Sequence, residues 1–138
     1  MGDKKKILII TDNTASMLNL AMKIASCFRK SPLAHYSIST LEAANFSAVD
    51  ILPVHAFFLG CDNPQSFSFL YIEDFFGHIN LAGRSCGIFS SNAIAIRYLT
   101  TLIRPCEAAM GKPFITKPDT VDGTALMEWI MGIVSQGE

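Results

Sequence analysis

Three short polar segments of this chain carry the side chains best suited to binding a small ligand. The segment TDNTASM follows an apolar run and precedes a helical pattern, and GCDN and SSN each follow a further apolar run. A turn between a strand and a helix often holds a phosphate, because the N–H groups of the helix start and nearby hydroxyls face the anion. The candidate binding residues are Thr11, Asp12, Asn13, Thr14, Ala15, Ser16, Met17, Gly60, Cys61, Asp62, Asn63, Ser90, Ser91 and Asn92.

Asp12 is the residue in TDNTASM that opposes phosphate chemistry. A phosphate monoester carries roughly −1.5 to −2 charges at neutral pH. A carboxylate ~5 Å away, at an effective dielectric constant of ~20, opposes it by about 3 kcal/mol per unit charge. Asp12 avoids this cost only if it points away from the turn or caps the following helix. The turn is therefore in the expected place for an anion, with altered chemistry.

No catalytic or metal-binding motif is present in the sequence. The four cysteines are scattered without a CxxC pair, and the three histidines form neither HxH nor HExxH. Such cysteines are expected to be reduced and mostly buried. We therefore assign no catalytic residue and no metal ligand, and an enzyme with its own active site has little support.

Length and charge limit the class of protein. The 138 residues are half apolar, which suits one domain over residues 1–138 with a single core. Eleven basic and twelve acidic residues give a net charge of −1, which argues against a nucleic-acid partner. The first apolar run, ILII, is too short for a signal peptide, and no stretch approaches the ~20 apolar residues that span a bilayer. We expect a cytoplasmic protein that does not bind membranes.

Strand and helix patterns alternate along the chain. Apolar runs predict strands at 4–10, 35–41, 54–60, 84–90 and 112–118, with Met110-Gly111 as a helix end. Helical periodicity covers 15–29, 69–79, 93–104 and 125–134, and Pro105 ends or kinks the third of these. This alternation predicts an α/β fold, a five-stranded parallel sheet in the order 2-1-3-4-5 with helices on both faces. Ligands in such folds bind at the carboxyl ends of strands one, three and four, where the three polar segments lie.

Two segments give the chain a resemblance to the short-chain flavodoxins. VHAFFLGCDNP resembles the family's third strand and second flavin loop, and FLYIEDFFGHINLAGRSCGIFSS resembles its aromatic-rich helix, turn and fourth strand. The resemblance covers nearly the whole chain. It implies noncovalent binding of FMN and one-electron transfer between redox partner proteins. On that basis 13–16 would hold the phosphate, while 60–63 and 90–92 would flank the flavin ring.

The sequence departs from the family pattern at both ends of this site. Aligning Ala21 with the family's alanine puts Asp12 in place of a hydroxyl, Ala15 in place of glycine and Met17 in place of threonine. Of the aromatic residues near the ring loops, Phe67 is a weak stacking candidate and Tyr98 is expected on a helix face.

FMN-dependent electron transfer is the leading hypothesis, and two alternatives stay open. One is a flavodoxin-like domain that has lost FMN and serves as a protein-interaction or other small-ligand-binding module. The other is a degenerate phospho-receiver used only for docking, since Gly60 stands where a receiver needs its phosphate-accepting aspartate. The segment SSN is also explained as a helix cap. The sequence does not indicate the oligomeric state.

Overall fold

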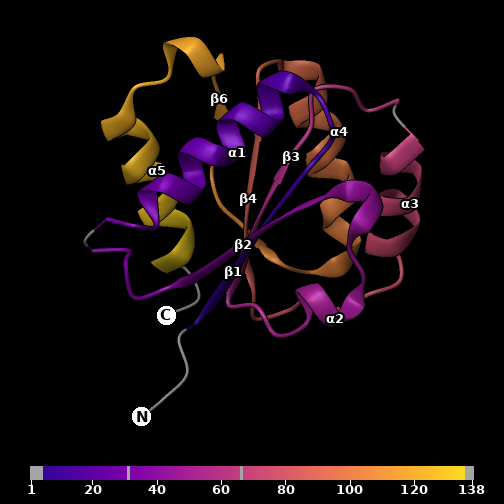
Figure 1. The fold of residues 1–138 in the computed structure, drawn as a ribbon. Coiled ribbons are helices and arrows are strands. Elements are labelled where there is room, and N and C mark those ends of the chain that lie inside the picture. The colour runs from indigo at the N-terminus through magenta and orange to yellow at the C-terminus, as the bar shows by residue number, and fades with distance from the viewer. Residues whose placement is uncertain (1–4, 31, 66, 136–138) are drawn as a thin grey trace.

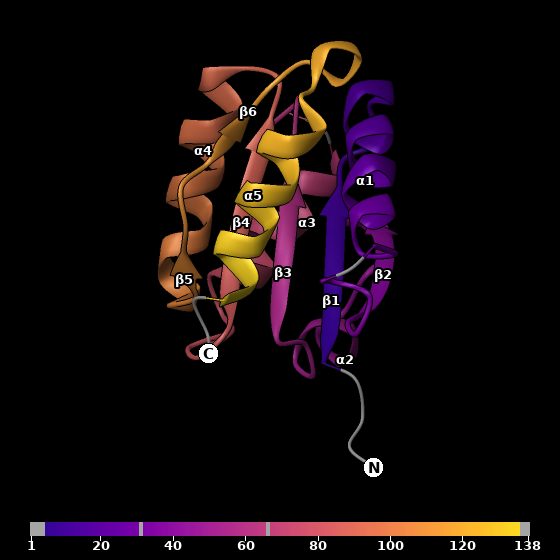
Figure 2. The ribbon, with the colours of Figure 1, turned by 90° about the vertical axis from the view of Figure 1, so that its left-hand side faces the viewer.

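The computed structural model describes residues 5–30, 32–65 and 67–135, which form a parallel sheet between two layers of helices (Figures 1 and 2). The sheet order is β2-β1-β3-β4-β5, with β6 also paired to β4, and every pairing is parallel. This confirms the predicted fold class. The strands are β1 (Lys6–Thr11), β2 (Ser37–Glu42), β3 (Ala56–Gly60), β4 (Ser85–Ser90), β5 (Ala109–Met110) and β6 (Phe114–Ile115).

The helices bury one apolar stripe each, on opposite faces of the sheet. One buried cluster joins the sheet to the first and last helices, and the other joins it to the remaining three. Figure 2 shows the first and last helices side by side over the same face. None of the described helices is long and apolar enough to cross a bilayer. The helices are α1 (Ala15–Cys27), α2 (Ala48–Ile51), α3 (Phe67–Phe76), α4 (Ala93–Ile103) and α5 (Gly123–Ser135).

The two central strands are buried along their whole length, as continuous apolar runs in parallel sheets should be. Phe57 packs into the cluster under α3 and α4, whereas Phe58 and Phe89 pack into the cluster under α1 and α5. Each such side chain contributes about 1.5–3 kcal/mol through burial. The core therefore fixes where β3 and β4 end, and with them the loops that follow.

The prediction of one strand at 112–118 is confirmed only at Phe114–Ile115, which form the short strand β6. The structure has two short strands instead, β5 and β6, and the residues expected to end a helix form β5. The cause lies upstream, where Pro105 converts the end of α4 into a 3₁₀ turn and Glu107 takes a left-handed conformation with φ 66°. The chain therefore turns back into the sheet at once.

The short helix α2 was not predicted. Four residues are too few to show helical periodicity. The signal that was available is its capping box, in which the backbone N–H of Ser47 donates to Asp50 Oδ2 at 2.8 Å. The α2 segment completes the connection from β2 to β3 on the face opposite α1.

Candidate functional site

The carboxyl ends of β1, β3 and β4 lie together at one end of the sheet, as the parallel arrows in Figure 2 show. Main-chain hydrogen bonds continue past the strand ends and tie the three loops together. Asp12 N–H donates to Gly60 O at 3.2 Å, and Cys61 N–H donates to Phe89 O at 3.3 Å. The structure thus brings the three predicted polar segments into one site, which we call the strand-end crevice: residues 11–17, 60–63 and 90–92.

Asp12 lies wholly buried at the centre of this crevice, with 0% of its surface exposed. Its Oδ1 accepts from Thr14 N–H at 3.2 Å and from the Thr14 hydroxyl at 2.6 Å. Its Oδ2 accepts from the N–H groups of Asp62 at 2.8 Å and Asn63 at 2.9 Å. Asp12 therefore neither points into solvent nor faces a ligand, but fastens the loop after β1 to the loop after β3.

Asp62 fastens the loop after β3 to the loop after β4 and to the start of α1. Its Oδ1 accepts from the Ser90 hydroxyl at 2.7 Å and from Ser91 N–H at 2.8 Å. Its Oδ2 accepts from the Ser91 hydroxyl at 2.6 Å and from the Ser16 hydroxyl. The half-buried carboxylate of Asp62 thus accepts four hydrogen bonds, about as many as an ionised carboxylate can take.

Both carboxylates are held by neutral donors only, since all eight bonds come from N–H or hydroxyl groups. Burial by itself raises the pKa of Asp62, but hydrogen bonds from Ser16, Ser91 and Ser90 outweigh it and hold the pKa below its ordinary value. Asp62 is therefore ionised at neutral pH, and the crevice carries that negative charge beside the start of α1.

Several predicted binding residues serve the core instead. Met17 and Cys61 have no exposed surface and belong to the two buried clusters. Burial, and next the charge of Asp12, raise the pKa of the Cys61 thiol, which makes it a poor nucleophile. A Cβ at Gly60 would lie 2.2 Å from the ring of Phe89, so glycine is needed there for packing.

The remaining predicted residues are divided between structural and exposed positions. Asn92 caps α4 by accepting from Ala95 N–H at 2.8 Å, so a capping role for SSN is confirmed. Thr11 and Ser90 are buried, whereas Asn13 and Ala15 are exposed at the start of α1. Thr14 occupies the N-cap position of α1, but its hydroxyl donates to Asp12.

The crevice residues do not fit a phosphate monoester in this arrangement. The hydroxyls of Thr14 and Ser16, which the family resemblance assigned to the phosphate, donate to carboxylates of the same chain. The hydroxyls of Ser90 and Ser91 do the same. A bound phosphate would find these donors engaged and a fixed negative charge among them.

The aromatic candidates supply no described ring-stacking group. Phe67 is the first residue of α3, and its side chain lies outside the described part of the structure. Tyr98 lies in α4, as predicted, where its hydroxyl donates to Glu73 Oε2 at 3.2 Å on α3. Burial, and next the charge of Glu73, raise the pKa of Tyr98. Its role is to join two helices.

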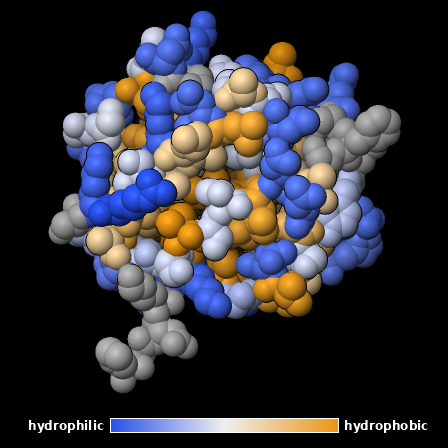
Figure 3. Space-filling model, in the orientation of Figure 1, coloured by the Kyte–Doolittle hydropathy of each residue, from blue (hydrophilic) through white to orange (hydrophobic). Residues whose placement is uncertain are grey.

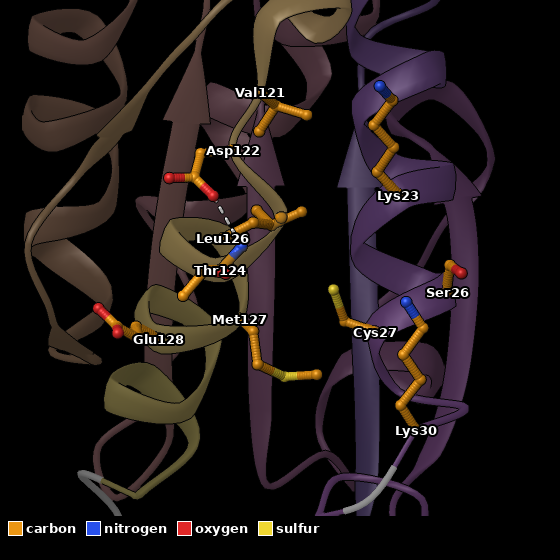
Figure 4. A pocket seen from close by; sticks show the side chains of 11 residues that line it. Lys23, Ser26, Cys27, Lys30, Val121, Asp122, Thr124, Leu126, Met127 and Glu128 are labelled. Carbon is orange, nitrogen blue, oxygen red and sulfur yellow. Dashed lines mark hydrogen bonds between the residues drawn. The ribbon is translucent and has the colours of Figure 1, made fainter.

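A separate hollow of about 680 Å³ lies between α1 and α5 (Figure 4). Its lining includes the buried Cys27 and Leu126, Lys23 of α1, Lys30 just beyond the end of α1, and Glu128 of α5. None of the predicted site residues lines it. Among the residues that the structure describes, no three histidine, cysteine or acidic side chains are grouped so that they could hold a metal ion.

Comparison with known proteins identifies the fold. No family model matches the chain, and no curated protein matches it. Solved structures do match: a short-chain flavodoxin associated with a bacterial microcompartment has a TM-score of 0.81 at 11% identity, over 97% of this chain and 99% of that one. The chain has the flavodoxin-like fold.

Two further flavodoxins agree with this result over the same extent. Flavodoxin 2 from Bacillus cereus has a TM-score of 0.77 at 15% identity, over 96% of this chain and 99% of that one. The flavodoxin of Streptococcus pneumoniae TIGR4 has a TM-score of 0.77 at 11% identity, over 95% and 98%. At these identities the likeness shows the flavodoxin-like fold and leaves the chemistry to the residues of the crevice.

Sequence reasoning found the polar segments but missed how they pair. It placed Asp62 among the residues that flank a flavin ring and Asp12 in the phosphate loop as an opposing charge, whereas the structure makes both of them internal acceptors. The available signal was that each aspartate lies within two residues of the end of a buried strand, on neighbouring strands of a parallel sheet, and that serine and threonine residues follow the strand ends.

Proposed function

We propose that this flavodoxin-like domain works without FMN, as a protein-interaction module. The observation that carries the proposal is the position of Asp62. Its carboxylate accepts the four hydrogen bonds from Ser16, Ser90 and Ser91 that an anionic ligand would need in the same place. The crevice is therefore already filled by an anion of its own.

Electrostatics supports the same proposal. To bind there, the phosphate of FMN has to displace Asp62 from its donors or lie beside it. A phosphate that lies beside Asp62 is opposed by about 3 kcal/mol per unit charge at ~5 Å and an effective dielectric constant of ~20. A phosphate that displaces Asp62 leaves a half-buried carboxylate without its donors. The cost is then the free energy of the hydrogen bonds that Asp62 loses.

FMN-dependent electron transfer is the second candidate function. The specific observation in its favour is that flavodoxins match the chain over nearly its whole length and theirs, with TM-scores of 0.77–0.81. The three loops of the crevice also leave the sheet at the strand ends where this architecture binds ligands. This function requires Asp62 to turn away from Ser16 and Ser91.

A titration of the purified chain with FMN distinguishes the two functions. Calorimetry and quenching of flavin fluorescence should show no saturable binding at high micromolar FMN, with an authentic apo-flavodoxin as the positive control. Saturable binding at micromolar or lower concentration would overturn the proposal and establish the second candidate. The variant Asp62→Asn, which removes the charge and keeps the shape, should bind FMN more tightly than the wild type if Asp62 is what excludes it.

A further inference from the structure

The hollow between α1 and α5 has the size of a small-molecule site. Its volume is about 680 Å³, and pockets that hold small ligands commonly measure roughly 300–1,000 Å³. Lys23, the first residue of α1 that lines it, follows Ser16 of the strand-end crevice by about two helical turns, or ~10 Å along the helix axis. The hollow is therefore a second candidate site, distinct from the crevice.

Apolar groups line the hollow between the two helices. Leu126 is buried, and Val121 and Met127 are half-buried. Figure 4 shows the side chains of Met127 and Cys27 in the gap between the helices. Burial raises the pKa of the Cys27 thiol, and the nearby charge of Lys30 lowers it by less, so the thiol is neutral at pH 7. The apolar body of a ligand can therefore lie against these side chains.

Two lysines add positive charge on the α1 side of the hollow. Lys23 belongs to α1, and Lys30 lies just beyond its last residue, Cys27. Figure 3 shows strongly hydrophilic residues at the left of the molecule, where the end of α1 lies next to α5 in Figure 1. In the part of the chain that the structure describes, Lys30 is paired with no carboxylate. An anionic group of a ligand would be attracted by both lysines.

The two acidic residues of the lining lie on the α5 side. Asp122 Oδ1 accepts from Thr124 N–H at 2.9 Å at the start of α5, so this oxygen is already engaged. Glu128 extends from α5 away from α1 in Figure 4. The hollow thus has a basic side at α1 and apolar groups beside it. This combination suits a molecule with an anionic end and an apolar body.

We propose that the hollow between α1 and α5 binds a small organic carboxylate. Its apolar body lies against Leu126 and Met127, and its carboxylate lies against Lys23 and Lys30. Burial of the apolar body supplies most of the affinity, in proportion to the apolar area removed from water. The lysines select the sign of the ligand's charge and, as exposed ion pairs, add less to the affinity. This inference goes beyond the proposed protein-interaction function and involves none of the crevice residues.

Titration of the full chain with 2-naphthoate, followed through the amide signals of the isotopically labelled protein in NMR spectra, tests the proposal. This probe has an aromatic body and one carboxylate. It should bind saturably with a dissociation constant of about 1 mM or lower and shift the signals of residues 23–30 and 121–128. The probe 2-naphthylmethylammonium keeps the ring and reverses the charge, and it should bind about tenfold more weakly or worse, because it loses two ion pairs.

Three variants separate the charge from the apolar contact. Lys30→Gln should weaken the binding of 2-naphthoate by about two- to fivefold, the effect of one exposed ion pair, without weakening that of the cationic probe. Met127→Gln should weaken the binding of both probes equally, because it removes an apolar contact that they share. Arg97→Gln is the matched control. It removes a positive charge from an exposed position of α4, on the opposite face of the sheet, and should change neither affinity.

Binding that depends on the charge of the probe and on Lys30, with shifts centred on the hollow, supports the proposal, once circular dichroism shows that the variants are folded. Any of three results would overturn it: no saturable binding of 2-naphthoate up to several millimolar, equal affinity for the two probes, or as large a loss in Arg97→Gln as in Lys30→Gln. Shifts centred on 11–17, 60–63 and 90–92, with tighter binding to Asp62→Asn, would overturn it as well, because the probe would then lie in the strand-end crevice.

Discussion

The strand-end crevice and the β2 edge show opposite ways of treating polar groups. In the crevice, Asp12 and Asp62 each accept four hydrogen bonds from their own chain. At the outer edge of β2, alternate main-chain groups face away from β1, and Leu18 and Met22 of α1 are exposed next to the strand. A surface whose groups already have partners gains little from a ligand, whereas an unpaired edge gains hydrogen bonds and apolar burial on contact.

On the proposed function, the strand ends, where the fold suggests a ligand, do not bind one. Ligands in doubly wound folds usually bind at the strand ends, and sequence reasoning followed that rule. Here the strand ends are joined to each other by carboxylates, so the general rule for the fold gives the location of the polar residues and not their use. The predictions below test the closed crevice against the open edge, from the largest expected effect to the smallest.

Gly60→Ala should lower the free energy of unfolding by about 3 kcal/mol, the upper end of the cost of overpacking a core. The added Cβ would lie 2.2 Å from the buried ring of Phe89, which has no exposed surface and contacts the Trp129 ring. Gly132→Ala is the matched control, since nothing lies within 4 Å of its Cβ position in α5. It should stabilise the protein by about 0.5–1 kcal/mol.

Chemical denaturation of the two variants measures both effects. If Gly60→Ala were as stable as the wild type, the glycine would not be explained by packing, and close approach of a ligand would regain support as its reason. A destabilised Gly132→Ala variant would show instead that replacing glycine by alanine lowers stability for a reason other than contact with the Phe89 ring.

Asp12→Ala should lower the free energy of unfolding by about 2 kcal/mol, because it removes the acceptor for charge-assisted bonds from the loop after β3. Ser39→Ala, at an exposed position of β2, should change it by less than about 0.5 kcal/mol. Urea titrations of both variants give the comparison directly. Equal effects would mean that the crevice is no more constrained than the edge.

Acidification should weaken the crevice through Asp62. Burial alone raises the pKa of this carboxyl, but hydrogen bonds from Ser16, Ser91 and Ser90 bring it below its unfolded value of about 3.9. The contribution of Asp62 to stability is therefore complete above that unfolded pKa and is lost as pH falls through the lower, folded pKa. Asp62→Asn should lack this part of the pH dependence.

Unfolding free energies of the wild type and of Asp62→Asn at a series of pH values between about 2 and 7 test this point. The difference between the two proteins should shrink as the solution becomes more acidic. A constant difference across the range would show that the charge of Asp62 does not contribute through its hydrogen bonds.

The sequence was sufficient for the architecture and for most elements. Long apolar runs such as those of β3 and β4, and the periodic stripe of α1, carry strong patterns, and the structure confirms them within a few residues. Short elements failed because two to four residues carry no periodicity, as in α2 and β5. The residue with the left-handed conformation, Glu107, is not a glycine, so its type does not indicate the turn.

The site was harder to predict than the fold because hydrogen bonding depends on side-chain direction. The sequence placed Asp12 and Asp62 at adjacent strand ends, but which donors their oxygens accept is decided by the paths of three loops. Gly60 and Met17 matched a ligand loop in position, whereas the core decides their identity through Phe89 and the α1 cluster. Packing and internal hydrogen bonds produce the same residue types as ligand binding does.

Chemical rescue of Asp62→Ala by a small carboxylate tests the central claim most directly, that the Asp62 side chain fills the crevice as its own anion. The melting temperature of the variant should be below that of the wild type and should rise on addition of formate, which restores an acceptor for Ser16, Ser90 and Ser91. Asp50→Ala, which removes an exposed capping carboxylate of α2, is the matched control and should gain nothing beyond the wild-type salt response. An Asp62→Ala variant as stable as the wild type, or equal formate responses in all three proteins, would contradict the claim.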